Sequence, residues 1–193
     1  MLFKFFWFIR ALFYKPFFGN FGLPSYIGRP LYLSGSKSVY IGKRVRIFPG
    51  IRLECISSNG SIFIGDNVSI GQRCHITAAS RLVIGKDTAI LFDVMITNID
   101  HEYQQIGVPV ASQPLIVKET RIGENCFIGS GAKIQAGTIL GRQCIVGTNA
   151  VVRGVFPDYS VIVGVPAKIV KRYNPKTEHW ESTNAKGEFL SEL

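Results

Sequence analysis

An aliphatic side chain recurs at every sixth position through most of this sequence. Fifteen such positions fall into sets of three: Ile41, Ile47, Leu53, Ile64, Ile70, Ile76, Ile84, Ile90, Ile96, Ile122, Ile128, Ile134, Leu140, Val146 and Val152. Glycine follows eight of them directly, and a small or aliphatic residue lies two places before each. Alternation at two residues predicts short strands, and glycine supplies the backbone freedom that a corner between strands needs.

Three six-residue units predict one triangular turn of the chain. The sequence divides into five such coils of eighteen residues, at 39–56, 62–79, 82–99, 120–137 and 138–155. Coils stacked at a strand spacing of about 4.8 Å would place like aliphatic side chains above one another in one core. The predicted fold class is therefore all-β, a parallel β-helix of about five coils, and its longest interruption is residues 100–119.

The first 35 residues do not match the repeat, so the predicted organisation is an N-terminal segment at 1–35, the β-helix at 36–165 and a C-terminal segment at 166–193. Residues 1–53 hold nine basic and no acidic residues, and the segment before residue 35 is rich in aromatics. This composition favours either a cap on the open end of the helix or contact with an anionic membrane surface. Lys4, Arg10 and Lys15 interrupt the apolar stretch, which argues against a membrane span and a signal peptide and predicts a cytoplasmic protein, peripheral at most.

Cysteine and histidine usage gives no metal site. The four cysteines show no paired spacing and three of them, Cys74, Cys126 and Cys144, fall in the inward register, so they are predicted to be reduced packing residues. The three histidines are too far apart in the sequence for the zinc site of a β-helical carbonic anhydrase. A pI of about 9.6 is compatible with nucleic-acid binding, but no recognised motif supports it, and we expect no nucleic-acid partner.

Three segments resemble the hexapeptide-repeat acyltransferases: "IGDNVSIG", "IGENCFIGSGAKI" and "VIVGVPAKIVKR". The resemblance spans residues 39–172 and implies a left-handed helix, a homotrimer with active sites between subunits, and acetyl-CoA as acyl donor. The segment "NIDHEY" and the aromatic, basic N-terminus are most similar to the O-acetyltransferases of bacterial surface polysaccharides, which implies a glycan or sugar acceptor.

Catalysis is expected where the repeat is interrupted, at the insertion that begins with Asp100 and His101. Acyl transfer from a thioester to a hydroxyl needs a base for the hydroxyl proton, and a neutral imidazole suits that task near neutral pH. In the family that the sequence resembles, the histidine of this loop is the general base, which implies that role for His101. Asp93, Asp100 and Glu102 could each orient the imidazole, and the sequence does not choose among them. Asp93 is a candidate catalytic partner because it ends a corner on the chain that leads to His101, although a corner residue with a local turn hydrogen bond fits it equally well.

The cofactor and acceptor residues follow from the same reasoning. The phosphates of coenzyme A require cations, and Arg153, Lys168 and Lys171 meet that demand, the two lysines on a short helix predicted to start near Pro166. By resemblance, the cofactor would also contact four corner residues, Gly129, Ser130, Gly147 and Thr148.

Four further residues are predicted to bind the acceptor: Asp100, Glu102, Tyr103 and His75. Two other functions remain open from the sequence alone. One is a small-molecule acetyltransferase acting on a free sugar, serine or an antibiotic, and the other is a noncatalytic β-helical scaffold.

Overall fold

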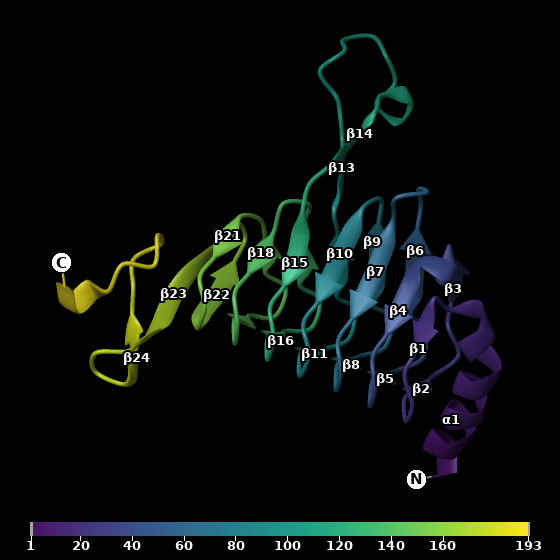
Figure 1. Cartoon of the computed structure of the whole chain (residues 1–193). Coiled ribbons are helices and arrows are strands. Elements are labelled where there is room, and N and C mark those ends of the chain that lie inside the picture. Colours follow the sequence, from purple (N-terminus) through teal and green to yellow (C-terminus); the bar gives the residue numbers. More distant parts are fainter. Residues whose placement is uncertain (1, 193) are drawn as a thin grey trace.

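The computed structural model describes residues 2–192, which form a triangular prism of stacked parallel strands with a helix at one end and a projecting hairpin (Figure 1). The prism contains six complete coils and a seventh that ends after its second parallel strand. The predicted β-helical fold class is confirmed, with about seven turns in place of five.

Three sheets form the faces of the prism, and we refer to them as sheets A, B and C. Sheet A consists of β1 (Asn20–Phe21), β4 (Val39–Ile41), β7 (Ser61–Ile64), β10 (Arg81–Ile84), β15 (Thr120–Ile122), β18 (Ile139–Leu140) and β21 (Val155–Phe156). Sheet B consists of β2 (Tyr26–Ile27), β5 (Arg46–Ile47), β8 (Ser69–Ile70), β11 (Ala89–Ile90), β16 (Phe127–Ile128), β19 (Ile145–Val146), β22 (Ser160–Gly164), β23 (Ala167–Asn174) and β24 (His179–Ser182). Sheet C consists of β3 (Tyr32–Ser34), β6 (Arg52–Cys55), β9 (His75–Ala78), β12 (Met95–Thr97), β17 (Lys133–Ile134) and β20 (Val151–Val152).

The inward ladder of aliphatic side chains forms the core, as the six-residue period predicts. On sheet C, Ile76 pairs with Ile96, and Ile96 pairs with Ile134 on the next coil. All three side chains are fully buried. Because each coil repeats the previous one, the outward residues between them also stack in rows along the prism.

The β-helix begins earlier than the sequence predicts. Residues 20–34, placed outside the repeat by the sequence analysis, form a complete first coil through β1, β2 and β3. The physical reason is that Phe21, Ile27 and Leu33 keep the six-residue spacing and face the core, although Leu33 is only partly buried. Ahead of this coil lie α1 (Leu2–Tyr14) and the short helix η1 (Lys15–Phe17), and η2 (Ser36–Ser38) connects it to the next coil.

The prediction of a C-terminal helix that starts near Pro166 is wrong. The chain turns at Val165 and Pro166, and Ala167–Asn174 returns as β23, antiparallel to β22. Ala167 and Ile169 alternate with exposed Lys168, which is a strand pattern with one buried face. β24 then pairs antiparallel with β23, and the chain ends at η4 (Leu190–Glu192).

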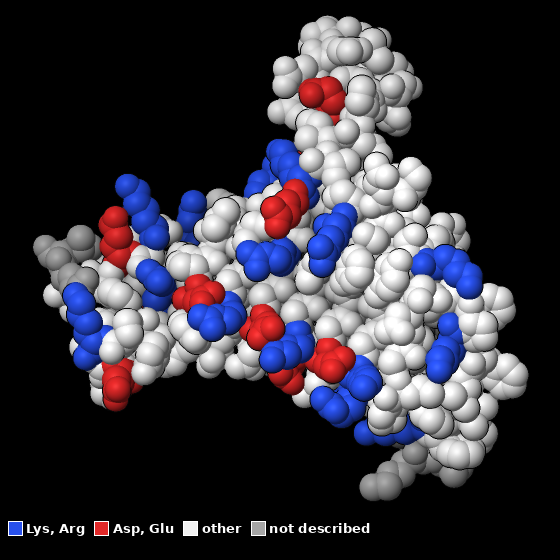
Figure 2. All heavy atoms as spheres, in the orientation of Figure 1, with Lys and Arg blue, Asp and Glu red and all other residues white. Residues whose placement is uncertain are grey.

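The corner between sheets A and B carries charges whose signs alternate from coil to coil. Arg142 binds Asp158 at 2.8 Å between Nη2 and Oδ2, and Lys86 lies 3.7 Å from Glu124 between Nζ and Oε2. Figure 2 shows basic and acidic side chains alternating along this edge. Such exposed pairs contribute little to stability individually, and their alternation avoids stacking like charges at the strand spacing.

Candidate functional site

A hairpin projects from the corner between sheets C and A (Figure 1). Its strands are β13 (Ile99–His101) and β14 (Leu115–Val117), with His101 opposite Leu115. The loop between them contains η3 (Val110–Ser112) and is braced by buried Gln113, whose Nε2 donates to the carbonyl oxygens of Gln105 and Val108. The predicted active-site insertion is thus an ordered arm.

His101 and Leu115 face a groove between the base of this arm and the outer surface of sheet C. The groove has a volume of about 500 Å³. Its lining comes from successive coils of sheet C and from the hairpin: Arg52, Glu54, Ile56, His75, Thr77, Met95, Thr97, Ile99, His101 and Leu115. The structure therefore brings His101 and His75, which are 26 positions apart in the sequence, into one groove.

His75 is held in this groove by a polar network. Its Nε2 lies 2.6 Å from Oε1 of Glu54 and 2.7 Å from Oγ1 of Thr77. The same Glu54 oxygen accepts hydrogen bonds from Nε and Nη2 of Arg52, at 3.1 and 2.8 Å. The Glu54 side chain is only 16% exposed, whereas 42% of the Arg52 side chain and 37% of the His75 side chain are exposed.

Glu54, Arg52 and Thr77 were not singled out from the sequence. A signal was present, because the inward ladder pairs Leu53 with Ile76, and that register places their outward neighbours side by side. The sequence could not show which of these outward groups form hydrogen bonds.

Asp100 anchors the hairpin to the prism and does not contact the His101 ring. Its Oδ2 lies 2.6 Å from Nη2 of Arg153, and its Oδ1 accepts the backbone N–H of His101 at 3.1 Å. The hydrogen bond from Arg153 holds the pKa of Asp100 below its ordinary value, against the opposing effect of partial desolvation. Asp100 and Arg153, predicted from the sequence to bind different substrates, therefore form one contact that fixes the base of the arm.

Asp93 lies on another corner of the prism, between sheets B and C. It adopts a positive φ of 61°, and its carboxylate forms two 2.8 Å hydrogen bonds with the guanidinium of Arg73. These hydrogen bonds lower the pKa of Asp93. Its carboxylate is thus engaged by Arg73 rather than by His101.

Glu102 and Tyr103 lie just beyond His101 in the loop. The Oε1 atom of Glu102 accepts the backbone N–H groups of Tyr103 and Gln104, at 3.0 and 3.2 Å. Glu102 therefore shapes the turn, while the Tyr103 side chain is exposed.

The four predicted corner residues lie in two stacked turns between sheets B and C. The backbone N–H of Gly129 donates to Val146, and that of Asn149 donates to Ser130. A Cβ atom at Gly129 would lie 2.6 Å from the backbone nitrogen of Thr148, so glycine is required for this close approach of the two turns. Together Gly129, Ser130, Gly147 and Thr148 form a continuous column of corners beside sheet C.

Lys168 and Lys171 share one face, although on a strand and not on the predicted helix. Lys168 pairs with Val163 and Lys171 with Val161, and a bulge between these pairs keeps both lysines exposed on the outer surface of sheet B. Arg153 follows β20, at the corner between sheets C and A, whereas the corner column lies between sheets B and C. The structure therefore does not bring Arg153 together with the two lysines.

All four cysteines are free and buried, and the inward register predicted this burial for Cys74, Cys126 and Cys144. Burial raises the pKa of Cys55 and of Cys74 to about 11. Thiols with such pKa values are protonated near neutral pH and are poor nucleophiles. Within residues 2–192, no three side chains of His, Cys, Asp or Glu are grouped so as to hold a metal ion.

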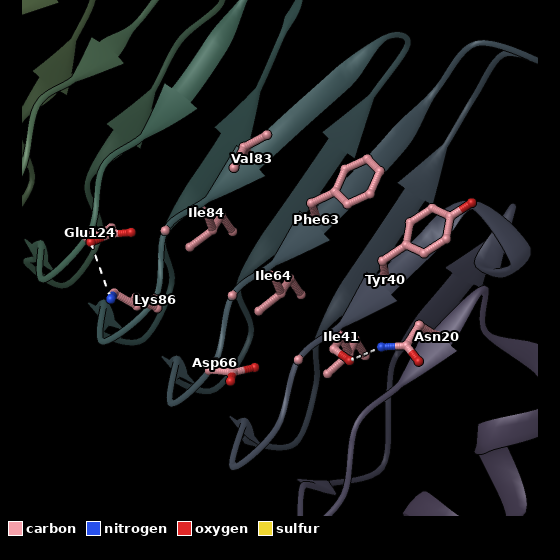
Figure 3. A pocket seen from close by; sticks show the side chains of 13 residues that line it. Asn20, Tyr40, Ile41, Phe63, Ile64, Asp66, Val83, Ile84, Lys86 and Glu124 are labelled. Carbon is pink, nitrogen blue, oxygen red and sulfur yellow. Dashed lines mark hydrogen bonds and ion pairs between the residues drawn. The ribbon is translucent and has the colours of Figure 1, made fainter.

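A second hollow, on sheet A, lies away from the hairpin. Figure 3 shows the rings of Tyr40 and Phe63 side by side on adjacent strands, and their centroids are 4.6 Å apart with an interplanar angle of 5°. Arg81 covers Phe63, with Cζ 4.8 Å from the ring centroid. No histidine lines this hollow, and its Lys86 and Glu124 form an ion pair with each other. The groove on sheet C is the better candidate for acyl-transfer chemistry.

Stacked six-residue repeats in a triangular prism, with a histidine-bearing arm beside a groove, are the features of a hexapeptide-repeat protein with a candidate active site. The family model described as "Bacterial transferase hexapeptide (six repeats)" matches residues 119–154. A relative from Escherichia coli K12, named "Putative lipopolysaccharide biosynthesis O-acetyl transferase WbbJ", is 36% identical over 160 residues, which are 79% of this chain and 81% of the relative. The chain belongs to the hexapeptide-repeat acyltransferase family.

Two other proteins illustrate how far the similarity extends. "Probable acetyltransferase Rv3034c" of Mycobacterium tuberculosis is 36% identical over 146 residues, which are 75% of this chain but 47% of that protein. Among solved structures, a mutant form of AntD, an N-acyltransferase from Bacillus cereus, in complex with dTDP and coenzyme A, superposes with a TM-score of 0.74. The superposed region covers 87% of this chain and 91% of the AntD chain. The sequences are only 18% identical, so this similarity shows the fold alone.

Proposed function

We propose that this protein is an O-acetyltransferase that moves an acetyl group from acetyl-CoA to a hydroxyl of a sugar, in a bacterial surface polysaccharide or its precursor. The observation that carries the proposal is the position of His101, which lines a groove on sheet C at the base of the arm, together with polar side chains such as Glu54 and His75. The 36%-identical relative named as a lipopolysaccharide biosynthesis O-acetyl transferase supports a glycan acceptor.

His101 would act as the general base. Its imidazole accepts the proton of the acceptor hydroxyl as the hydroxyl oxygen attacks the thioester carbonyl, and it returns the proton to the departing CoA thiolate. This route needs no covalent enzyme intermediate, in agreement with the burial of all four thiols. Because Asp100 and Arg153 fix the base of the arm, they act as positioning residues for His101.

Coenzyme A would lie along the corner column that Ser130 and Thr148 form beside sheet C. The column leads toward the turn before β23, where Lys168 could meet a phosphate group. The support is the close backbone approach at Gly129 and the coenzyme A bound to the AntD structure, which shares this fold.

The arm itself favours a homotrimer with active sites between subunits. It projects from the prism and exposes several apolar side chains, among them Tyr103, Ile106 and Val110. An exposed apolar arm is suited to contact with a neighbouring copy. A neighbour packed there would close the groove around His101 and exclude water from it.

The test is thiol release from acetyl-CoA by the purified protein in the presence of lipid-linked glycans, free sugars or amino acids. We expect turnover with glycan or sugar acceptors. Turnover with serine alone would indicate a small-molecule acetyltransferase, and absence of acetyl-CoA binding in calorimetry would indicate a noncatalytic scaffold.

We also propose that the outer face of α1 contacts an anionic membrane on the cytoplasmic side. One face of the helix packs on the prism through Trp7, whose ring lies 5.8 Å from that of Tyr26, and through fully buried Ala11. The opposite face exposes Phe5, Phe6, Ile9, Leu12 and Phe13. A helix that is apolar on both faces is expected to be covered on both.

The charge of this end favours lipid as the covering partner. Residues 1–53 contain nine basic residues and no acidic residue. On the face shown in Figure 2, no acidic side chain lies over the end of the prism that carries α1. No helix within residues 2–192 is long and apolar enough to cross a bilayer, so the contact proposed is an interfacial one.

Substituting Phe6→Ser together with Phe13→Ser is expected to weaken binding to vesicles of phosphatidylcholine and phosphatidylglycerol by roughly tenfold or more, because apolar area leaves the lipid. Co-sedimentation at several salt concentrations measures it, and binding should fall as salt rises. Val155→Ser with Leu190→Ser, exposed away from both α1 and the arm, is the matched control. Equal sedimentation of the wild-type protein and both variants would contradict the proposal. A changed oligomeric state of the Phe6→Ser, Phe13→Ser variant would instead indicate that the outer face of α1 contacts another copy of the chain.

A further inference from the structure

A row of outward side chains continues the groove away from the hairpin. Tyr32, Arg52, His75 and Met95 are register neighbours on four successive strands of sheet C. Three strand spacings make this row about 14 Å long. The Cζ atom of Arg52 lies 5.4 Å from the centroid of the Tyr32 ring, so the row is packed side chain against side chain.

The contacts of His75 determine which of its nitrogens carries the proton. Nε2 lies 2.6 Å from a Glu54 oxygen that also accepts two N–H groups of Arg52. An ionised carboxylate at that distance requires Nε2 to be the donor, because a lone pair there would face the negative charge. In the neutral ring Nδ1 is then the acceptor, and within residues 2–192 it has no hydrogen-bond partner.

The free groups of this network match a sugar. His75 offers a lone pair at Nδ1, and the part-exposed Arg52 offers the N–H groups that it does not donate to Glu54. A sugar hydroxyl can donate to the first and accept from the second. The partly buried carboxylate of Glu54 accepts from both side chains and fixes their orientation.

We propose that Arg52 and His75 form a subsite for a second, non-reacting sugar of the acceptor, with Glu54 as the positioning residue. His75 Nδ1 accepts a hydrogen bond from a hydroxyl of that sugar while the reacting sugar lies at His101. The inference rests on the function proposed above, and it narrows the acceptor to a chain of at least two sugars. Free monosaccharides and serine would leave the subsite empty.

Two substitutions separate a binding role of His75 from a structural one. In His75→Gln the amide nitrogen takes the place of Nε2 and keeps the bond to Glu54, but the Nδ1 acceptor is lost. In His75→Asn the amide oxygen takes the place of Nδ1 and the bond to Glu54 is lost. A structural role predicts that Gln is the better replacement, whereas the subsite predicts that Asn is.

The experiment compares acetyl transfer to galactose, glucose and N-acetylglucosamine with transfer to their β-linked trisaccharides. We expect the wild-type protein to prefer a trisaccharide, and His75→Gln to lower kcat/KM for it by roughly tenfold through the acceptor KM, with the acetyl-CoA KM unchanged. His75→Asn should recover part of this loss, and His179→Gln, outside the groove, should change nothing.

Three results would overturn the subsite: no preference of the wild-type protein for the longer acceptor, a better rescue by Gln than by Asn, or equal losses for monosaccharide and trisaccharide. Each of these would leave the proposed O-acetyltransferase intact if sugars are acetylated. Failure of every sugar, with transfer to serine, would instead overturn the proposed function itself.

Discussion

His101→Ala is expected to lower kcat for acetyl transfer by about 10²- to 10⁴-fold, the usual contribution of a positioned general base. The side chain is exposed at the end of β13 and lines the groove on sheet C. Its removal deletes the proton acceptor for the attacking hydroxyl without touching the core. The measurement is steady-state thiol release with the acceptor that gives the highest turnover, with circular dichroism to confirm folding.

His179→Ala is the matched control for this experiment. His179 is also exposed and also lies on a strand, but on β24, outside the residues that line the groove. We expect it to retain wild-type kcat. A His101 variant with unchanged kcat would contradict the proposed base, whereas an unchanged kcat with a raised acceptor KM would assign His101 to binding.

Ile96→Ala is expected to lower the free energy of unfolding by about 2–5 kcal/mol, the range for removing a large aliphatic side chain from a packed core. Ile96 is fully buried between its ladder neighbours Ile76 and Ile134. A cavity at this position interrupts the ladder on β12, the strand that leads into the hairpin. Chemical denaturation followed by circular dichroism measures the loss.

Ile106→Ala provides the comparison, since this isoleucine is 95% exposed at the tip of the arm. The same atoms are deleted there without a cavity, so unfolding is expected to shift by less than about 0.5 kcal/mol. Equal destabilisation by both substitutions would mean that the ladder is not the main source of stability. If the arm packs on a neighbouring copy as proposed, Ile106→Ala weakens the oligomer while the separate protomer keeps its stability.

The fold was predictable because each coil repeats one local rule. The sequence register places Ile76, Ile96 and Ile134 in a single ladder, and the structure confirms it. The first coil was not predicted, because an eight-residue step between Leu33 and Ile41 breaks the six-residue period and because its aromatic residues favour a cap. The pairs Phe21–Gly22 and Ile27–Gly28 keep the spacing and the corner glycine, and they could have revealed it.

For the candidate site, the sequence indicates a position on the fold but not the contacts that form there. The interruption of the repeat at residues 100–119 points to His101, because chemistry needs groups that the apolar core cannot supply, and in the structure this insertion forms the hairpin. The contact between Asp100 and Arg153 spans 53 positions and depends on how the arm leaves the prism, which no repeat encodes. The basic pattern around Lys168 fits a helical face and an exposed strand face alike, and the turn at Val165 and Pro166 decides between them.

The reversal of the chain at β23 ends the stack of parallel coils. Each parallel coil presents to its successor the same backbone edge that it received, so a stack of such coils has no intrinsic end and can be extended by another molecule's first coil. Sheet B instead finishes with two strands of alternating direction, β23 and β24. An incoming coil must pair with all three sheets at once, but sheet B ends two strands beyond β22, whereas sheets A and C end at β21 and β20, so the three edges are not level. We therefore expect residues 167–182 to hinder the stacking of another molecule's first coil on this end of the prism.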